Sequence, residues 1–205
     1  MSDVKPRHEM TLRAERARVT RRRIADAART LFSRHGYGAT TITAIAAEAG
    51  VAVQTVYAVH RSKAGILRVL REELVNQPEA DALFAEALTE RDPQRTVALF
   101  AASIRARWQA GHDLVAIDAQ AAATDPTVRS DMEHVLARRR AGIDRIAQSL
   151  GPALAPGLDV PRAKAILDAL TMPEVYAELV DVHGWSADAF EVWLAQTLCR
   201  EILPR

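Results

Sequence analysis

The sequence predicts an all-α protein. Its 205 residues are rich in Ala, Leu, Arg and Glu, only 5% are aromatic, and apolar positions recur at helical rather than alternating spacing. No dipeptide typical of a tight hairpin separates two alternating apolar runs. With 49% apolar and 26% charged residues, the chain is long enough to bury one sizeable core or two small ones.

The first helix is expected to end near His35. Apolar residues repeat at helical spacing from Ile24 to Phe32, which gives that helix one buried face. Gly36 follows, and glycine ends a helix readily because it adopts a left-handed backbone without steric penalty. Residues 1–17, before this helix, are expected to form a flexible basic arm.

Three short helices are expected to follow. Thr40 and Thr41 offer hydroxyl caps to the second helix, which spans barely two turns and is closed by Gly50. The third helix starts at once, so no long loop separates the two. Its expected inward residues are Val51, Val56 and Tyr57. Ser62 is the expected cap of the fourth helix.

The rest of the chain is predicted to form longer helices. Asp92-Pro93 and Asp125-Pro126 each place a capping carboxylate before a proline, whose missing N–H costs nothing at the first helical position. The breaker-rich segment at residues 151–161 is the longest connection.

Charge is distributed unevenly along the chain. The net charge is only +1, but residues 1–78 carry 14 Lys and Arg against 7 Asp and Glu, whereas residues 79–205 carry 13 against 19. A basic segment joined to a larger acidic one is typical of a polyanion-binding module on a body with another task. A solvated basic face is the alternative that charge alone leaves open.

Several classes of site find no support in the sequence. The chain has one cysteine, Cys199, expected to be an inert buried residue, and its six histidines never take a metal-ligand spacing with it. Without a nucleophile elbow or a phosphate-cradling glycine loop, we expect neither an enzyme nor a cofactor. No apolar run approaches the roughly 18 residues of a membrane span and no secretory signal is present, so a cytoplasmic location is expected.

The two short helices around Gly50, packed after the first helix, have the arrangement of a helix-turn-helix. In that motif the second helix enters the DNA major groove. Its outward side here is expected to carry small or uncharged residues, namely Ala52, Val53, Gln54, Thr55 and Ala58. A solvated helix would carry Lys and Glu instead, whereas a glutamine amide pairs with adenine and a Val or Thr methyl touches the thymine methyl.

Phosphate contacts are expected at the rim of this surface. Helix N-termini and basic side chains are natural phosphate binders. The candidate donors are Arg21, Arg22, Arg23, Thr40, Thr41, Tyr57, His60, Arg61 and Lys63. The arginine run opposes the dipole of the first helix, a small cost that an adjacent phosphate would offset.

Residues 21–67, RRRIADAARTLFSRHGYGATTITAIAAEAGVAVQTVYAVHRSKAGIL, resemble the TetR-type bacterial transcriptional regulators. The alanine pair and Phe of the first helix are followed in order by Gly-Tyr, the Thr pair, Ile-Ala, Ala-Gly-Val, Thr-apolar-Tyr and Ser-Lys. A weaker likeness continues in TMPEVYAELVDVHGWSADAFEVWLAQTL, residues 171–198, which looks like the regulatory domain of some members.

The resemblance implies an all-α homodimer with a helix-turn-helix domain, here residues 18–64, and a helical regulatory and dimerisation domain, residues 65–205. It implies a repressor that binds a palindromic operator and is released by a small molecule. An architectural DNA-binding protein without a ligand is the alternative, which the acidic body disfavours. The predicted DNA contacts are Arg22, Thr41, Val53, Gln54, Thr55, Tyr57, His60 and Lys63.

Two positions depart from the family pattern. Ala52 stands where a hydroxyl cap is common, which weakens the cap of the third helix by about 0.5–2 kcal/mol. His60 stands where an aromatic residue is common. It either packs in place of that residue or contacts a phosphate.

The last two helices offer the best dimerisation surface, and a ligand pocket is expected between helices of the body. The apolar stripe of the last two helices faces either a partner or the chain's own core, and the resemblance favours the partner. The predicted interface residues are Ile166, Leu167, Leu170, Phe190, Trp193, Leu194, Thr197 and Leu198. The candidate pocket residues are Phe100, Trp108, His112, Met132, Met172, Tyr176 and Trp185. Plain core packing is the alternative for each of them, and a surface cap for His112.

Overall fold

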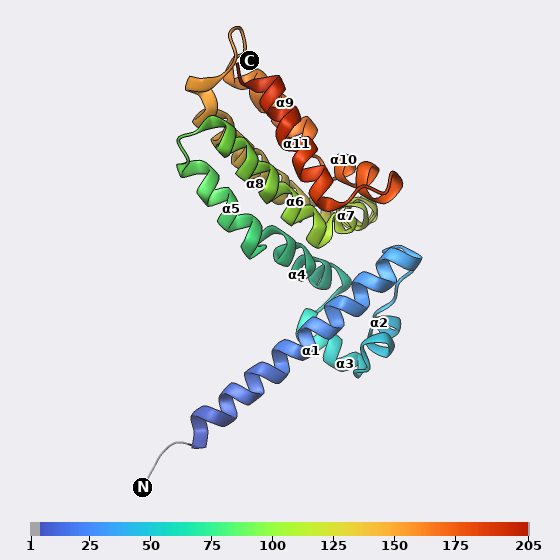
Figure 1. The fold of residues 1–205 in the computed structure, drawn as a ribbon. Helices are drawn as coiled ribbons and strands as arrows, with labels where there is room; N and C mark the ends of the chain where they lie inside the picture. The colour runs from blue at the N-terminus through green and yellow to red at the C-terminus, as the bar shows by residue number, and fades with distance from the viewer. Residues whose placement is uncertain (1–4, 205) are drawn as a thin grey trace. The chain divides into compact units, whose positions relative to one another are not determined.

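The computed structural model describes the backbone of residues 5–204 and the side chains of residues 15–204 (Figure 1). These residues form helices and no strand, as the sequence predicts. The helices are α1 Lys5–His35, α2 Ile42–Ala49, α3 Val53–His60, α4 Lys63–Val75, α5 Pro78–Thr89, α6 Pro93–Gly111, α7 Asp113–Thr124, α8 Pro126–Leu150, α9 Val160–Leu170, α10 Pro173–Ala177 and α11 Ala187–Ile202. A 3-10 turn spans Gly151–Ala153, and a π-helical turn spans Glu178–Val182.

The described chain forms two compact units. Unit 1 contains the chain up to Arg71 together with Ala116–Ser130, and unit 2 contains Glu72–Val115 and the chain from Asp131 onward. Unit 1 therefore extends beyond the expected boundary at residue 64 and includes a segment from much later in the sequence. Hydrophobic periodicity does not predict that Ala116–Ser130 belongs to unit 1, because this segment packs against unit 1 through contacts between residues distant in sequence.

The core of unit 1 lies where α1 packs against both α2 and α3. Each helix contributes apolar side chains that are almost fully buried. They include Ile24, Ala28, Phe32, Ile45, Val56, Ile66 and Leu67. Burying one large aliphatic or aromatic side chain stabilises the fold by about 1.5–3 kcal/mol, so this cluster holds the short helices α2 and α3 in place.

The connections of α2 follow the sequence prediction. Thr41 is the N-cap, and its hydroxyl accepts the N–H of Ala44 at 3.1 Å. Gly50 closes the helix with φ of 62°, a left-handed conformation that favours glycine. Thr40 has a different role, because its buried hydroxyl donates to the carbonyl of Gly36 at 2.8 Å and fastens the loop after α1.

Helix α1 differs from the sequence prediction at its N-terminal end. The expected flexible arm over residues 1–17 is helical from Lys5 onward. Ile24 is the first buried side chain along α1, and the described side chains before it are exposed except for the half-buried Thr20. Residues 15–23 of α1, whose side chains the structure describes, therefore make little contact with the rest of the described chain.

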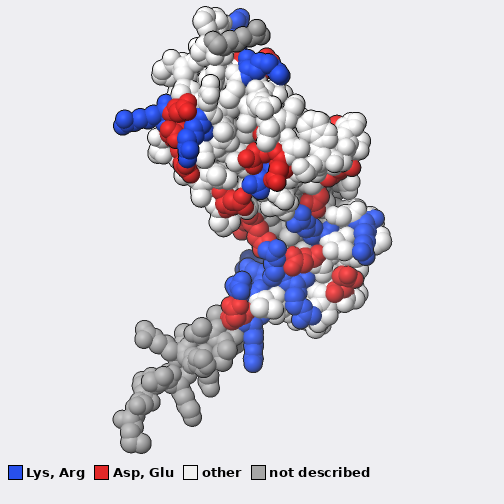
Figure 2. All heavy atoms as spheres, viewed as in Figure 1, with Lys and Arg blue, Asp and Glu red and all other residues white. Residues whose placement is uncertain are grey.

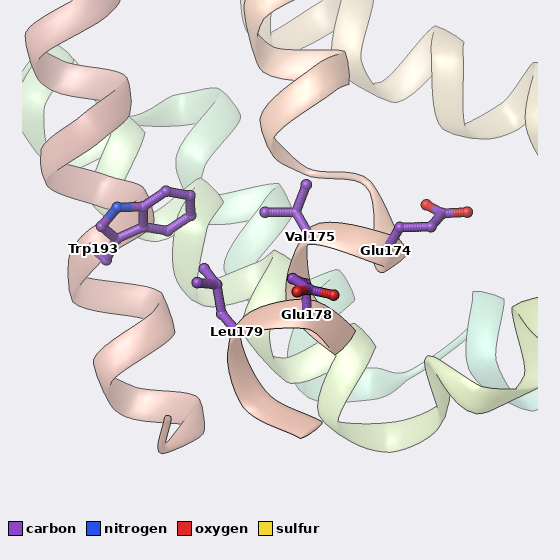
Figure 3. Close-up of a pocket in the computed structure, with 5 residues that line it drawn as sticks. All are labelled: Glu174, Val175, Glu178, Leu179 and Trp193. Carbon is purple, nitrogen blue, oxygen red and sulfur yellow. The ribbon is translucent and has the colours of Figure 1, made fainter. Parts of the chain in front are cut away.

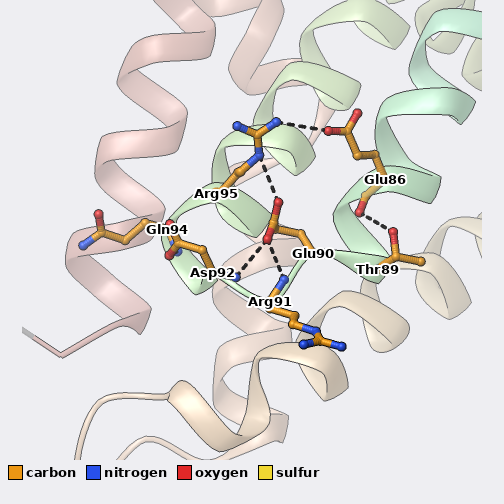
Figure 4. Close-up of polar contacts among 7 residues, drawn as sticks. All are labelled: Glu86, Thr89, Glu90, Arg91, Asp92, Gln94 and Arg95. Atoms are coloured by element: carbon orange, nitrogen blue, oxygen red, sulfur yellow. Dashed lines mark hydrogen bonds and ion pairs between the residues drawn. The ribbon is translucent and has the colours of Figure 1, made fainter.

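Helix α6 is the centre of unit 2 and packs against α5 and α11. Its start is shown in Figure 4: Asp92 caps α6 by accepting the N–H of Gln94 at 3.0 Å, as the Asp-Pro signal predicts. The Glu90 carboxylate accepts the main-chain N–H groups of Arg91 and Asp92 and pairs with Arg95 at 2.9 Å. Because two main-chain N–H groups stabilise the ionised carboxylate, the pKa of Glu90 lies below its usual value. The carboxylate thus fixes the sharp turn between α5 and α6.

Within the described part of the chain, no single helix is long and apolar enough to cross a bilayer. The pair α2 and α3 reaches that length and composition only when counted together across a bend of 105°.

Candidate nucleic-acid interface

Helix α3 has one buried side and one exposed side. Val56 is fully buried and His60 is 5% exposed, so the buried side is set by two residues four positions apart. Tyr57 is 53% exposed. The expectation that Tyr57 points partly inward is therefore wrong, because one residue along a helix turns the side chain by about 100° away from Val56.

The exposed side of α3 carries no charge. Ala52, Gln54, Tyr57 and Ala58 are exposed, and Val53 and Thr55 are half-buried beside them. Neither the Gln54 amide nor the Tyr57 hydroxyl has a hydrogen-bond partner among residues 15–204. The side therefore presents an amide, a phenol and methyl groups, which match the polar edges and the thymine methyl of the major groove.

The N-terminus of α3 has the weak cap that its sequence predicts. Ala52 occupies the N-cap and makes no side-chain hydrogen bond to the helix. The main-chain carbonyl of Ala52 still accepts the N–H of Thr55 at 2.9 Å. The first N–H groups of α3 therefore lack a side-chain acceptor.

Two of the predicted phosphate donors already have partners inside unit 1. Lys63 Nζ donates to the carbonyl of Tyr37 at 2.7 Å and lies over the Tyr37 ring at 4.5 Å. Burial lowers the pKa of the Lys63 ammonium, and the nearby Asp125 carboxylate acts in the opposite direction. Arg22 pairs with Asp26 at 3.0 Å on the exposed side of α1. Lys63 therefore has a structural role, because its ammonium group holds the loop after α1.

Thr41 keeps a donor for an external acceptor. Its oxygen accepts the N–H of Ala44, but its own hydroxyl proton is directed to no acceptor among the described residues. Because Thr41 is exposed at the N-terminus of α2, the helix dipole also favours a phosphate there.

His60 packs in the core, which decides between the two alternatives that the sequence leaves open. Its ring is 5% exposed, and neither ring nitrogen has a hydrogen-bond partner among the described residues. Burial lowers the pKa of His60, the main chain of Arg21 acts in the opposite direction, and the Arg21 charge lowers it further. His60 therefore acts as a packing group, and its buried ring has no exposed surface for the predicted phosphate contact.

Three residues near α3 have structural roles that the sequence analysis missed. Arg23 Nη2 donates to the carbonyl of Ala49 at 2.6 Å and ties α1 to the turn between α2 and α3. Arg61 ends α3 with φ of 66°, which is strained for a residue other than glycine. Gly65 lies so close to α3 that an added Cβ would be 2.0 Å from the carbonyl oxygen of His60. Spacing along the chain reveals none of these contacts.

The charge of unit 1 suits a polyanion. Figure 2 shows Lys and Arg side chains gathered over the first helices. The positions assigned to unit 1 carry 15 Lys and Arg against 7 Asp and Glu in the sequence, and those of unit 2 carry 12 against 19. The basic excess therefore lies on the unit that contains α3.

Three of the seven candidate ligand residues are core residues of unit 2. Phe100, Trp108 and Tyr176 are at most 6% exposed. Met172 is 44% exposed, while Met132 and Trp185 are half-buried. His112 packs against Tyr176, with ring centres 5.0 Å apart, and Trp108 donates its indole N–H to the carbonyl of Thr171. Core packing therefore accounts for the three most buried candidates.

His112 links two segments of unit 2. Its Nδ1 lies 2.8 Å from the carbonyl oxygen of Trp108, and its Nε2 lies 2.7 Å from an Asp181 carboxylate oxygen. The doubly protonated ring is the form that donates to both oxygens. His112 is the C-cap of α6, as the cap alternative has it, and its side chain also fastens the end of α6 to the π-helical turn.

An open groove of about 350 Å³ lies elsewhere in unit 2, and none of its lining residues is among the predicted pocket residues. The lining residues are Glu174, Val175, Glu178, Leu179 and Trp193 (Figure 3). The indole of Trp193 faces Val175 and Leu179 across the groove, and Glu174 and Glu178 lie at its edge. The predicted pocket and the observed groove are therefore different places.

The predicted dimer residues divide into two groups. Leu167, Phe190, Leu194 and Leu198 are 0% exposed, because α11 packs on α6 and α9 of the same chain. These four residues pack in the core of their own chain. The prediction that they face a partner is therefore corrected. Thr197 is 8% exposed, whereas Ile166, Leu170 and Trp193 are half-buried and keep surface for a partner.

Comparison with known proteins identifies the class to which this helix-turn-helix belongs. Residues 24–70 match the sequence model of the bacterial regulatory proteins of the tetR family. Residues 24–70 are therefore similar to the DNA-binding domain of TetR-type regulators, and further helices follow them in the chain. No curated protein matches the chain.

Solved structures of several regulators are similar to this chain over nearly its whole length. The SmeT–triclosan complex is 19% identical with a TM-score of 0.72, over 90% of this chain and 92% of that one. NalD, a repressor of a multidrug efflux pump in Pseudomonas aeruginosa, is 20% identical with a TM-score of 0.67, over 92% and 98%. A regulator from Saccharomonospora viridis in complex with choline is 21% identical with a TM-score of 0.68, over 90% and 98%. At these identities the likeness establishes the fold.

Proposed function

We propose that this chain is a TetR-type transcriptional repressor, which binds a palindromic operator as a homodimer and is released by a small molecule. The observation that carries the proposal is the exposed side of α3, where Gln54 and Tyr57 are unpaired among the described residues and where none of the residues from 53 to 59 carries a charge. A solvated helix has no physical reason to present such a side. A helix that enters the major groove does, because base edges are read by amides and methyl groups.

The geometry supports a division of the proposed DNA contacts. Gln54 is the base reader, and Val53 and Thr55 supply apolar contacts beside it. Thr41 and Tyr57 donate to phosphates at the rim, together with Arg22 and the N–H of Lys63 that is not directed at a carbonyl. His60 supports α3 from inside.

A homodimer is proposed because one eight-residue helix reaches too few base pairs for repressor-like affinity. Two-fold operators are read by two-fold dimers. The surfaces left for a partner are Ile166 and Leu170 on α9 and the 55% exposed Val192 on α11. The proposed interface therefore uses these residues and omits the predicted interface residues that are 0% exposed.

The proposed effector is a small organic compound bound by unit 2. Similar structures hold triclosan, choline or stearoyl-CoA according to their descriptions. In this chain the groove beside Trp193 offers an indole and aliphatic walls, with carboxylates at the edge, which suit an organic compound that carries positive charge.

The proposal is tested by selecting duplexes from a randomised pool with the purified full-length protein. A two-fold symmetric consensus, bound by two chains at least about a thousandfold more tightly than random DNA, is the expected result. Equal affinity for selected and random duplexes would instead support the architectural alternative. A compound library titrated against the operator complex then tests the effector, and the absence of any compound that changes DNA affinity would remove that part of the proposal.

A further inference from the structure

The segment Ala116–Ser130 contacts the loop between α1 and α2, although it comes much later in the sequence. The Tyr37 hydroxyl of that loop donates to Asp125 Oδ2 at 3.0 Å, and Tyr37 is only 4% exposed. A Cβ added to Gly36 would lie 3.4 Å from the side-chain oxygen of Gln120, so α7 also has a side chain against this turn. Both contacts lie inside unit 1, where the segment is part of the frame that holds the loop.

The Asp125 carboxylate is held in one orientation. Its Oδ1 accepts the main-chain N–H of Thr127 at 3.0 Å and that of Val128 at 3.4 Å, which caps the start of α8. Its Oδ2 is the oxygen that accepts the Tyr37 hydroxyl. Because the main chain of α8 fixes one oxygen, the other is a fixed acceptor for Tyr37.

The loop held in this way leads directly to Thr41. It has two buried anchors, Tyr37 and Thr40, and the residues between them are exposed. The Thr40 hydroxyl bonds to the end of α1 and its turn, through the carbonyls of Leu31 and Gly36. The Tyr37 anchor instead ties the loop to the start of α8.

A carboxylate in this unit is unfavourable for DNA binding on charge alone. Unit 1 has a basic excess, and each acidic group within it weakens the attraction for phosphate. Removing the charge of Asp125 should therefore strengthen binding to any duplex. Losing its hold on the loop has the opposite sign, so the effect of charge and the effect of position can be separated.

We propose that Asp125 is a positioning residue for operator binding. Through the Tyr37 hydroxyl it fixes the loop that places the Thr41 hydroxyl against a phosphate of the operator. Asp125 acts through Tyr37 and not by touching the duplex, because its two oxygens are used by α8 and by Tyr37. The inference rests on the proposed function, in which Thr41 is a phosphate donor.

The test compares two substitutions of Asp125 that remove the same charge. Asp125→Asn and Asp125→Ser both keep a good cap for α8. The asparagine amide still reaches Tyr37 and can donate to its hydroxyl oxygen, whereas a serine hydroxyl that caps α8 is too short to reach it. Asp92→Ser is the control, because Asp92 is the matching cap before a proline in unit 2. Operator affinity is measured by fluorescence anisotropy, at a temperature below the thermal transition of every variant.

Asp125→Ser is expected to bind the operator about tenfold more weakly than wild type, the usual cost of losing one hydrogen bond to a charged group. Asp125→Asn should bind at least as tightly as wild type, because it loses a repulsive charge and keeps the contact with Tyr37. Asp92→Ser should bind as wild type does.

A Thr41→Val background shows whether the effect passes through Thr41. Valine keeps the shape of threonine and removes the donor. In this background Asp125→Ser is expected to cost less than about twofold, because the contact that it displaces is already absent. A role confined to the stability of the fold would cost the same in both backgrounds.

Equal operator affinities of Asp125→Ser and Asp125→Asn would overturn this inference and leave the proposed function intact. The same holds for an equal cost of Asp125→Ser with and without the Thr41 hydroxyl. A wild-type protein that binds selected and random duplexes equally would overturn the proposed function instead. The failures are therefore separate observations.

Discussion

Arg71 and Asp118 form a buried two-pronged ion pair that joins α4 to α7. Arg71 Nε and Nη2 donate to the two Asp118 carboxylate oxygens at 2.9 and 2.6 Å, and the side chains are 5% and 10% exposed. The pair is part of unit 1, where it attaches a segment 47 residues further along the chain. Planar guanidinium and carboxylate groups match in this geometry, which lysine cannot reproduce.

Removing one member of this pair should be strongly destabilising. Arg71→Met leaves a buried carboxylate without its guanidinium and is expected to lower the free energy of unfolding by about 3–5 kcal/mol. Urea unfolding followed by circular dichroism measures the change. Arg95→Met is the control, because Arg95 is 61% exposed beside Glu90 and should cost at most about 1 kcal/mol. Similar small losses for both variants would contradict a structural role for the Arg71–Asp118 pair.

Two tyrosines should show opposite effects. The Tyr37 hydroxyl donates to Asp125 at 3.0 Å, and burial together with that carboxylate holds the pKa of Tyr37 far above its usual value. Tyr37→Phe is expected to lower the free energy of unfolding by about 1.5–3 kcal/mol, because it removes a hydrogen bond to a charged group. Tyr57→Phe should leave stability unchanged and weaken binding to operator and random DNA alike. The reverse pattern would show that Tyr57 packs and that Tyr37 is dispensable.

Substitutions of Gln54 and Lys63 should differ in their effect on base preference. Gln54→Ala is expected to lose about 1–3 kcal/mol of discrimination at one operator position, since an amide reads one base edge. Lys63→Ala should weaken binding to all duplexes alike and also lower stability, because Lys63 Nζ braces the Tyr37 carbonyl. The measurement is affinity for a set of single-base operator variants. If Gln54→Ala weakens every duplex equally, its assignment as a base reader is wrong.

Replacing His60 should alter the pH dependence of stability. Burial lowers the folded-state pKa of His60, so below about pH 6.5 the unfolded chain binds a proton that the folded chain excludes. His60 therefore contributes a loss of stability as the pH falls below 6.5 and has no such effect at higher pH. His60→Phe is expected to flatten the curve between pH 7 and 5.

The same variant should also gain stability at neutral pH. Both ring nitrogens of His60 are buried without a hydrogen-bond partner among the described residues. Their removal is expected to raise the free energy of unfolding by about 1–3 kcal/mol. Unfolding curves of wild type and variant at pH 5, 6, 7 and 8 provide both measurements. A variant less stable than wild type at pH 8, with unchanged pH dependence, would mean that the ring is satisfied in the folded chain.

Gly65 should tolerate no side chain. An added Cβ would lie 2.0 Å from the His60 carbonyl oxygen, so α3 and α4 would have to separate. Gly65→Ala is expected to cost about 1–3 kcal/mol of unfolding free energy and to weaken operator binding through displacement of α3. Gly38→Ala is the matched control, because nothing lies within 4 Å of its added Cβ. Thermal unfolding and operator affinity of the two variants should therefore differ clearly.

Most of the secondary structure could be predicted, because its signals are local. The cap at Thr41, the stop at Gly50 and the Asp-Pro start of α6 all act within a few residues of themselves. The exposed side of α3 was predicted for Gln54 by the same periodicity. Tyr57 was misplaced because a single apolar ring is compatible with either side until Val56 and His60 are seen to fill the core together.

The sequence by itself determined the helical class, the helix-turn-helix and the basic character of its unit, because caps, periodicity and charge need no knowledge of distant residues. Only the tertiary structure decided that His60 packs, that Leu167 and Phe190 belong to the chain's own core, and that Arg71 meets Asp118. Each of these depends on which segments approach across the fold. That approach is set by the packing of whole helix faces, which no local pattern records.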